Sequence, residues 1–282
     1  MTLLSGVKDH SKLLIVDGLS DTVNTLDRES RWPGIPYAFG SIYNFGGNTS
    51  MGAISTVWLD RYFTARDKAG SALTGVAILP EGFYNNPAAY ELMSELPWMD
   101  DKPDHTQWFR DYAEGRYGSD AGGDAWEIIA ETAYSMEPIG THSESHDSLF
   151  AAQPSLTATK ARACCARGEI RYDLAEFATA LPALIEADSS VVQRAAYEYD
   201  LTDVTRQVIA NLSHELLPQI NAAYGAKDLD TFDDLTGTWL EMIEQLDAVI
   251  ATNSEFLLGA YVDRAEAQNG AIGAYDLQNL LT

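Results

Sequence analysis

Short apolar segments near the start of the chain predict buried parallel strands. Three segments, at residues 12–16, 36–43 and 75–79, are almost continuous in apolar side chains and are bounded by Gly, Pro, Asn or Asp. Residues 51–68 lie between the second and third segments and carry apolar side chains at helical spacing. Because a strand–helix–strand crossover joins parallel strands, we expect a parallel sheet in this part of the chain.

The pattern changes to amphipathic helices after residue 86. Residues 135–158 form the exception, because they are rich in Ser, His and Pro and lack periodicity, which predicts a loop. We therefore expect an α/β segment followed by an all-helical one, with domains at 1–150 and 151–282. The helices that the pattern predicts cover residues 88–96, 107–117, 125–134, 190–224, 230–250 and 256–267.

The composition describes a globular, strongly acidic protein. The chain has 282 residues, is 46% hydrophobic and carries a formal net charge of −24. Such a charge disfavours binding to nucleic acids and to anionic membrane surfaces, and no apolar stretch reaches the ~20 residues of a membrane span. The N-terminus shows no signal peptide, so we expect a cytoplasmic chain as it stands and leave the compartment open. The adjacent Cys164 and Cys165 predict neither a disulfide nor a zinc site.

Candidate chemistry follows from the expected sheet, because ligands bind at the carboxyl ends of parallel strands. Glu81 comes directly after the third segment, between Pro80 and Gly82, and is a candidate nucleophile or general base. The alternative is that Glu81 caps the next helix. The aromatic side chains around these strand ends suit either a sugar-stacking wall or an ordinary core. Those aromatic side chains are Tyr37, Phe39, Tyr43, Phe45, Phe83 and Tyr84.

A metal site is the weaker alternative. His142 and His146 are four residues apart and alternate with Glu144 and Asp147, but they fall in the predicted loop and no third ligand is fixed. The sequence also lacks a phosphate-binding loop, a dinucleotide-binding turn and a nucleophile elbow. We therefore expect neither a metal nor a cofactor.

Residues 43–48 read Tyr-Asn-Phe-Gly-Gly-Asn, and residues 79–82 read Leu-Pro-Glu-Gly. These blocks resemble a strand-end signature and the PEG motif of the α-N-acetylglucosaminidases, glycoside hydrolase family 89. The blocks occur in the order of the family between residues 13 and about 267. Further similar blocks are at residues 86–92, 116–118, 125–126, 154–156, 199–207 and 256–259.

The resemblance implies a retaining exo-glycosidase that removes terminal α-linked N-acetylglucosamine from a glycan. It implies a (β/α)8 barrel followed by a helical domain, with this chain supplying the last three βα units of the barrel. Glu81 falls on the catalytic nucleophile of the family, and Asn44 with its neighbours Tyr43 and Asn48 falls on a substrate-binding loop. Phe39 falls on a position that is often Trp in the family, which implies a stacking contact with the sugar.

The same resemblance also implies that part of the catalytic machinery lies elsewhere. A complete barrel takes ~250 residues, and the general acid/base of the family lies on an earlier strand than the three expected here. A retaining mechanism needs two carboxyl groups about 5 Å apart, whereas Glu91 and Glu95 are expected to point away from Glu81. Two hypotheses stay open: an enzyme completed by its missing N-terminal part, or an inactive fragment that acts as a helical interaction module.

Overall fold

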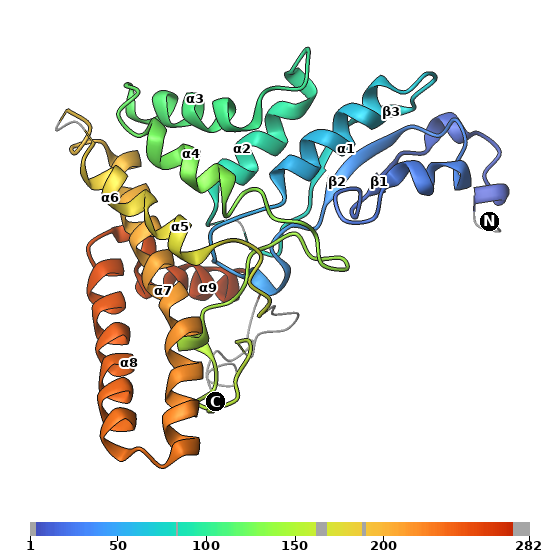
Figure 1. Ribbon diagram of the computed structural model, residues 1–282. Coiled ribbons are helices and arrows are strands. Elements are labelled where there is room, and N and C mark those ends of the chain that lie inside the picture. The colour runs from blue at the N-terminus through green and yellow to red at the C-terminus, as the bar shows by residue number, and fades with distance from the viewer. Residues whose placement is uncertain (1–3, 83, 162–167, 188–189, 273–282) are drawn as a thin grey trace.

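The structure is a computed structural model that describes residues 4–82, 84–161, 168–187 and 190–272 (Figure 1). Phe83, Cys164 and Cys165 lie outside the described residues, so the expectations for them stay untested. The described part of the chain consists of a small sheet with its crossover helix, followed by helices. This arrangement confirms the predicted change from an α/β segment to an all-helical one.

The sheet has three strands, β1 (Ile15–Asp17), β2 (Tyr37–Ser41) and β3 (Leu73–Ile78), in the order β1–β2–β3. Both pairs are parallel, as the sequence predicts, and the register shifts once between Tyr37 and Ala38. Every residue of the central strand β2 is buried, whereas β3 is mostly half-buried. The outer sides of β1 and β3 have no partner strand among the described residues.

Helix α1 (Ser55–Asp67) is the crossover between β2 and β3 and confirms the predicted helix (Figure 1). Its apolar side chains recur at helical spacing, so one face buries Trp58, Leu59 and Tyr62 against the sheet. The ring of Tyr62 meets the ring of Phe39 edge to face, with 5.8 Å between centroids. Burial of these large rings is the main force that holds α1 on the sheet.

The remaining helices pack beside and beyond the sheet. Helices α3 and α4 contact each other. Helix α3 also contacts α1 and α7, and α4 contacts α6. The packing therefore passes across residue 150 without a break, and the domain boundary expected there stays a prediction. These helices are α2 (Pro87–Glu95), α3 (His105–Tyr117), α4 (Gly123–Glu131), α5 (Leu174–Ala178), α6 (Ala180–Ile185), α7 (Ala195–Ala226), α8 (Leu229–Ile250) and α9 (Leu258–Ile272).

Helices α7 and α8 form a long antiparallel hairpin that projects from the body (Figure 1). One face of α7 is buried along most of its length, from Tyr197 to Ala223, whereas no residue of α8 is buried in this chain. Where α7 enters the core, Asp200 accepts two hydrogen bonds from Arg116 and one from the hydroxyl of Tyr117. No helix in the described ranges has both the length and the hydropathy that a bilayer crossing requires.

Candidate functional site

Two loops meet at the carboxyl edge of the sheet. The first follows β2 and includes residues 44–52, and the second follows β3 and includes residues 79–86. They approach so closely that a Cβ atom on Gly82 would lie 3.2 Å from the Cα atom of Gly47. Gly47 and Gly82, which are 35 positions apart in the sequence, are therefore brought together at this edge.

Glu81 lies in the second loop, just beyond β3, and its side chain is exposed. The amide of Leu79 donates to the carbonyl of Ser41 at 2.9 Å, which continues the sheet pairing almost to Glu81. The helix that follows begins at Pro87, and its N-terminal flanking residue is Asn86. The structure thus places a solvent-accessible carboxyl group where parallel α/β folds bind their ligands.

Three buried asparagines, Asn44, Asn85 and Asn86, join the two loops, and we call them the asparagine clasp. The side-chain nitrogen of Asn44 donates to the carbonyl of Gly82 at 2.8 Å and to the Oδ1 atom of Asn85 at 3.2 Å. Asn44 adopts a left-handed backbone conformation with φ of 68°, which Asn tolerates better than most residues. The clasp therefore fixes the backbone on the C-terminal side of Glu81.

Asn85 and Asn86 hold the first loop from the other side. The side-chain nitrogen of Asn85 donates to the carbonyl of Asn48 at 2.9 Å. Asn86 donates to the carbonyl of Ser50 at 2.9 Å, and its Oδ1 atom accepts from the amide of Gly52 at 2.9 Å. The hydroxyl of Tyr134 adds a second bond to that oxygen at 3.0 Å. These side chains replace the backbone pairing that irregular loops lack.

Phe39 and Tyr43 lie beneath the site. Phe39 is 0% exposed and packs in the core, so no part of its ring reaches the surface. Tyr43 is also buried, donates from its hydroxyl to the carbonyl of Gly52 at 2.7 Å and meets the ring of Trp58 edge to face. The contacts of both rings are thus those of core side chains that support the two loops.

Asn48 connects the first loop to a buried segment at residues 142–147. Its side-chain nitrogen donates to the carbonyl of Ser145 at 3.0 Å and to the Oδ1 atom of Asp147 at 3.1 Å. Its own Oδ1 atom accepts from the amide of Ser50 at 2.7 Å, which closes a turn within the loop. Both polar atoms of the Asn48 amide therefore have partners in the protein.

The two histidines considered as metal ligands have separate partners. The Nδ1 atom of His142 lies 2.5 Å from the Oε1 atom of Glu144, and the Nε2 atom of His146 lies 3.0 Å from the Oδ1 atom of Asn211 on α7. Burial lowers the pKa of His146 to about 4, so this ring is neutral near pH 7. Within the described ranges, no three His, Cys, Asp or Glu side chains converge as a metal site requires.

Two other carboxylates, the last residue of β1 and one just beyond it, lie at the same edge of the sheet. Asp17 accepts hydrogen bonds from Thr25 and Arg28, both at 2.7 Å. Asp21 is 1% exposed and accepts from the hydroxyl of Ser41 at 2.6 Å and from the indole of Trp58 at 3.3 Å. Burial raises the pKa of Asp21 to about 6. Both side chains are buried and hydrogen-bonded to other side chains of the protein.

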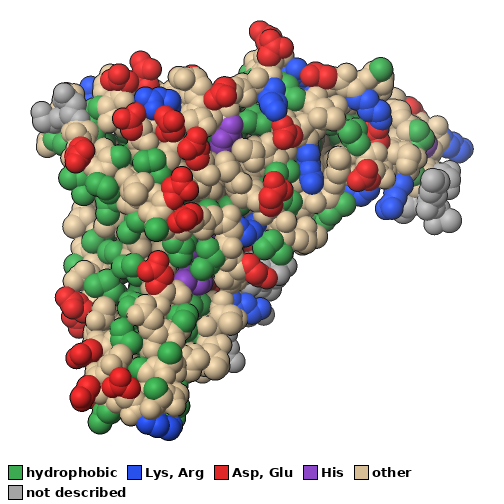
Figure 2. Space-filling view, in the orientation of Figure 1, with side chains coloured by type: hydrophobic (Ala, Val, Ile, Leu, Met, Phe, Trp, Pro, Cys, Tyr) green, Lys and Arg blue, Asp and Glu red, His purple; other side chains and the backbone are tan. Residues whose placement is uncertain are grey.

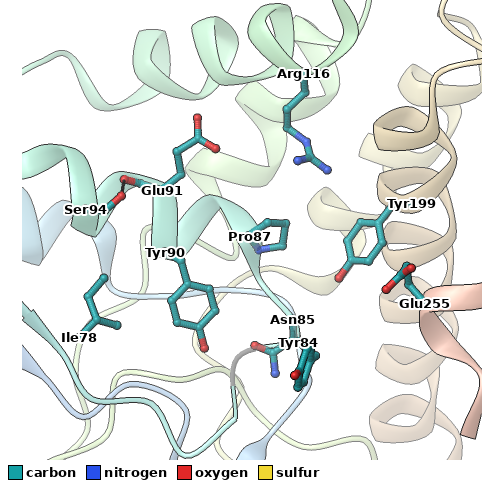
Figure 3. Close-up of a pocket in the computed structure, with 10 residues that line it drawn as sticks. All are labelled: Ile78, Tyr84, Asn85, Pro87, Tyr90, Glu91, Ser94, Arg116, Tyr199 and Glu255. Carbon is teal, nitrogen blue, oxygen red and sulfur yellow. Dashed lines mark hydrogen bonds between the residues drawn. The ribbon is translucent and has the colours of Figure 1, made fainter. Parts of the chain in front are cut away.

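A cavity of about 770 Å³ adjoins the Glu81 loop between α2, α3 and α7 (Figure 3). The hydroxyl of Tyr90, which lines this cavity, donates to the carbonyl of Gly82 at 2.6 Å. Arg116 and Glu91 project from opposite walls in Figure 3, and Glu81 is not among the lining residues. The cavity is therefore lined by Tyr84 and Asn85 of the loop that carries the candidate nucleophile, but not by Glu81 itself. Its lining residues are Ile78, Tyr84, Asn85, Pro87, Tyr90, Glu91, Ser94, Arg116, Tyr199 and Glu255.

The surface carries the acidic excess that the composition predicts. Figure 2 shows acidic side chains distributed over the visible face, whereas hydrophobic side chains gather along the limb formed by α8. Among the hydrophobic side chains exposed on that helix are Leu229, Leu240 and Ile243. An acidic surface suits a neutral ligand better than an anionic one.

Several residues of this edge were not among those expected from the sequence. Asn85 and Asn86 could have been found, because a pair of asparagines after a strand and before a proline is typical of a structured turn. Gln207 on α7 ends one of the blocks that resemble the family, but nothing in that block indicates that its Oε1 atom accepts from the amide of Met51, as it does at 2.8 Å. Its partner is 156 positions away in the sequence, and only the folded structure brings the two together.

Family models match both parts of the chain. The model described as the alpha-N-acetylglucosaminidase (NAGLU) tim-barrel domain matches residues 1–100. The model described as the alpha-N-acetylglucosaminidase (NAGLU) C-terminal domain matches residues 108–275, which is more than half of the chain. The site at the edge of the sheet thus falls within the barrel match, and most of α3 together with α4 to α9 falls within the C-terminal match.

A curated relative and solved structures agree with these matches. The chain is 30% identical over 268 residues to alpha-N-acetylglucosaminidase from Homo sapiens, covering 93% of this chain and 35% of the relative. A family 89 glycoside hydrolase from Clostridium perfringens, in complex with PUGNAc, superposes with a TM-score of 0.80 at 27% identity over 92% of this chain and 29% of that one. A doubly Glu-to-Gln-substituted form of that enzyme, in complex with its substrate GlcNAc-alpha-1,4-galactose, gives a TM-score of 0.82 at 26% identity over the same shares. The chain thus spans about a third of the length of these proteins.

Proposed function

The chain belongs to the α-N-acetylglucosaminidase family, and from this membership we propose that it carries the nucleophile half of a retaining glycosidase active site. The substrate in this proposal is a glycan with a terminal α-linked N-acetylglucosamine, and the nucleophile is Glu81. The observation that carries the proposal is the exposed carboxyl group of Glu81 at the carboxyl edge of the sheet, in a loop fixed by the asparagine clasp.

Glu81 would act by attacking the anomeric carbon of the sugar. The attack forms a glycosyl-enzyme ester and expels the aglycone oxygen, which a carboxylic acid protonates; water then cleaves the ester. Such an attack demands a carboxylate held in one orientation. The hydrogen bonds from Asn44 and Tyr90 to the carbonyl of Gly82 support this role, because they fix the backbone directly beside Glu81.

The second carboxyl group is proposed to come from outside these 282 residues. Of the described carboxylates at the sheet edge, Asp17 is bound by Arg28 and Thr25, and Asp21 is enclosed by Ser41 and Trp58. Neither is open to a glycosidic oxygen. Because the chain spans about a third of its relatives, the part of those proteins that it does not match is the natural source of the acid.

The alternative function is that of a helical interaction module without turnover. It is favoured by the outer edges of the sheet, where β1 and β3 lack partner strands among the described residues. Val16 on β1 is 50% exposed, as an apolar side chain at a contact surface would be. Under this alternative the chain binds another polypeptide and Glu81 has no chemical role.

A direct assay separates the two functions. The purified 282-residue chain is tested against an aryl α-N-acetylglucosaminide, beside its Glu81→Gln variant, with and without an added polypeptide that supplies the rest of the barrel. The proposal predicts that Glu81→Gln lowers turnover by about a thousandfold or more in whichever form is active, because the amide does not attack the anomeric carbon. The free energy of unfolding should change by no more than about 1 kcal/mol, because Glu81 is exposed and glutamine keeps the size of its side chain.

The matched control is Glu91→Gln. Glu91 is another exposed glutamate, ten positions further on, and it projects into the cavity that adjoins the loop (Figure 3). Its substitution should leave turnover within a factor of about three, since it is placed away from the reacting atoms. Equal turnover of the Glu81→Gln variant and the unmodified chain would overturn the assignment of the nucleophile. The NMR signal of the first-formed sugar anomer reports retention or inversion.

A further inference from the structure

We infer that Gln207 on α7 is a positioning residue for the active-site loops, so that the helical region directly sets the orientation of Glu81. This inference rests on the proposed function of Glu81. Gln207 is 1% exposed and lies on the buried face of α7. It does not belong to the sheet or to either loop, and it acts through the backbone of the first loop.

The contact between α7 and the first loop includes two hydrogen bonds to the backbone. The Oε1 atom of Gln207 accepts from the amide of Met51 at 2.8 Å. One position earlier on the helix, Arg206 donates to the carbonyl of Thr49 at 2.8 Å. The loop is thus bound on both sides of Ser50 by side chains more than 150 positions away in the sequence.

The bound segment leads directly to the asparagine clasp. Asn86 binds the carbonyl of Ser50 and the amide of Gly52, which flank the Met51 amide that Gln207 holds. Asn85 binds the carbonyl of Asn48 and accepts from Asn44, which in turn holds the carbonyl of Gly82. A series of buried and partly buried hydrogen bonds, joined by short stretches of backbone, therefore runs from α7 to the residue after Glu81.

The first loop has little freedom to adjust if this contact is lost. Gly52 has φ of 127°, and a Cβ atom there would lie 2.5 Å from the carbonyl oxygen of Ala133. The amide of Ala53 donates to that same carbonyl at 3.0 Å. The loop is thus enclosed between the end of the α4 region and α7, and a displacement at Met51 must be transmitted to Asn86.

Gln207 also fixes the hydrogen-bonding state of its neighbours. Because the Met51 amide is a donor, it must face the Oε1 atom, which leaves the Nε2 atom of Gln207 to donate to the Oδ1 atom of Asn211 at 2.8 Å. That oxygen also lies 3.0 Å from the Nε2 atom of His146, so this nitrogen carries the proton. One backbone amide thus determines two amide orientations and one histidine tautomer.

The test is hydrogen–deuterium exchange in the full 282-residue chain. Gln207→Met keeps the length of the side chain but does not accept from Met51, whereas Gln207→Glu keeps an acceptor. The proposal predicts that the methionine variant accelerates exchange of the Met51 and Gly52 amides, and of the Ala89 amide at the start of α2, by about tenfold. Exchange within α3 should not change. The glutamate variant should restore most of the protection.

The outcomes separate a positioning role from a general structural one. Faster amide exchange at Met51 alone would show that the first loop moves independently of Asn86. Uniformly faster exchange that includes α3 would show global destabilisation. Either result overturns the proposal. Gln219→Met, at an exposed position of the same helix, is the control and should change none of these amides. If Gln207→Met does not fold, Arg206→Lys shortens the reach to Thr49 and must give the same local pattern at smaller size.

The exchange result does not depend on the chemistry of Glu81. Loss of turnover in Glu81→Gln together with unchanged exchange in Gln207→Met would refute the positioning role and retain the proposed function. The reverse combination would refute the nucleophile and retain the coupling of α7 to the loops. Where turnover is measured, Gln207→Met should lower kcat by about tenfold with KM unchanged, because the orientation of Glu81 matters in the transition state.

Discussion

The two loops at the sheet edge and the α7–α8 hairpin owe their structures to different interactions. In the loops, buried asparagine side chains bind backbone groups, and each bond depends on one particular side chain. In the hairpin, regular helices contact through repeated apolar side chains, and α8 has no buried residue. The loops should therefore be sensitive to single substitutions, whereas the outer hairpin should tolerate them.

The same difference explains where sequence analysis succeeds. The strands and helices follow from the spacing of apolar side chains, so the parallel sheet, its crossover helix and the long C-terminal helices are confirmed. The asparagine clasp does not follow from periodicity, because each bond depends on the exact placement of one amide. Glu81 could be placed at the sheet edge from its position after a strand, whereas the contact of Gln207 with Met51 required the fold.

The aromatic residues show a second limit. A run such as Tyr-Ala-Phe-Gly-Ser predicts a buried strand, but periodicity does not decide which ring faces a ligand when every position is buried. Phe39 and Tyr43 are enclosed by α1 and α2 side chains, including Tyr62 and Tyr90. The stacking contact of Phe39 with the sugar stays a prediction, and its burial gives the side chain a clear structural role.

Truncation of the central strand should give the largest effect on stability. Phe39→Ala removes a fully buried ring and leaves a cavity beside Tyr62, so we expect the free energy of unfolding to fall by about 3–5 kcal/mol. Urea denaturation followed by circular dichroism measures this loss. Phe39→Leu fills more of the cavity, so its loss should be less than half of that in Phe39→Ala. A fall below about 1 kcal/mol for Phe39→Ala would contradict its place in the core. KM measured on the folded fraction tests the stacking contact separately.

Removal of the clasp should have the next largest effect. Asn86→Ala deletes bonds to Ser50, Gly52 and Tyr134 and leaves those buried groups without a partner, so we expect a loss of about 3 kcal/mol. Asn86→Gly deletes the same bonds but relaxes the backbone, whose φ is 45°, and should cost about 1 kcal/mol less than alanine. Equal losses for the two variants would show that backbone strain at this position is negligible. Thermal unfolding under identical conditions makes the comparison.

The buried carboxyl of Asp21 should make the sheet edge sensitive to pH. Burial raises its pKa to about 6 in the folded chain, above the 3.8 of the model compound, so folding favours the protonated form. Its ionisation therefore reduces the free energy of unfolding as the pH rises from about 4 to above 6, by on the order of 2–3 kcal/mol. Asp21→Asn removes this dependence.

The difference between the unmodified chain and Asp21→Asn is therefore the quantity to follow. The variant should gain stability relative to the unmodified chain as the pH rises from 4 to 7, measured by urea denaturation at each pH. Comparison within this pair cancels the contributions of the other buried groups, such as His146, whose lowered pKa gives the opposite trend. A constant difference across this range would show that Asp21 is ionised in the folded chain at all these values.

The outer hairpin should give the smallest effect. Leu240 on α8 is 62% exposed, and Leu240→Gln removes little buried apolar area, so the free energy of unfolding should change by no more than about 0.5 kcal/mol. The neighbouring Trp239 is half-buried and its ring lies 4.5 Å from that of Phe150, so Trp239→Ala should cost at least about 1 kcal/mol more. Urea denaturation of both variants measures how much of the hairpin is stabilised by contacts within this chain. An exposed leucine contributes little to stability when a hairpin is stabilised by many small apolar contacts. A large loss in Leu240→Gln would therefore contradict this comparison and show that α8 is as sensitive to single substitutions as the loops at the sheet edge.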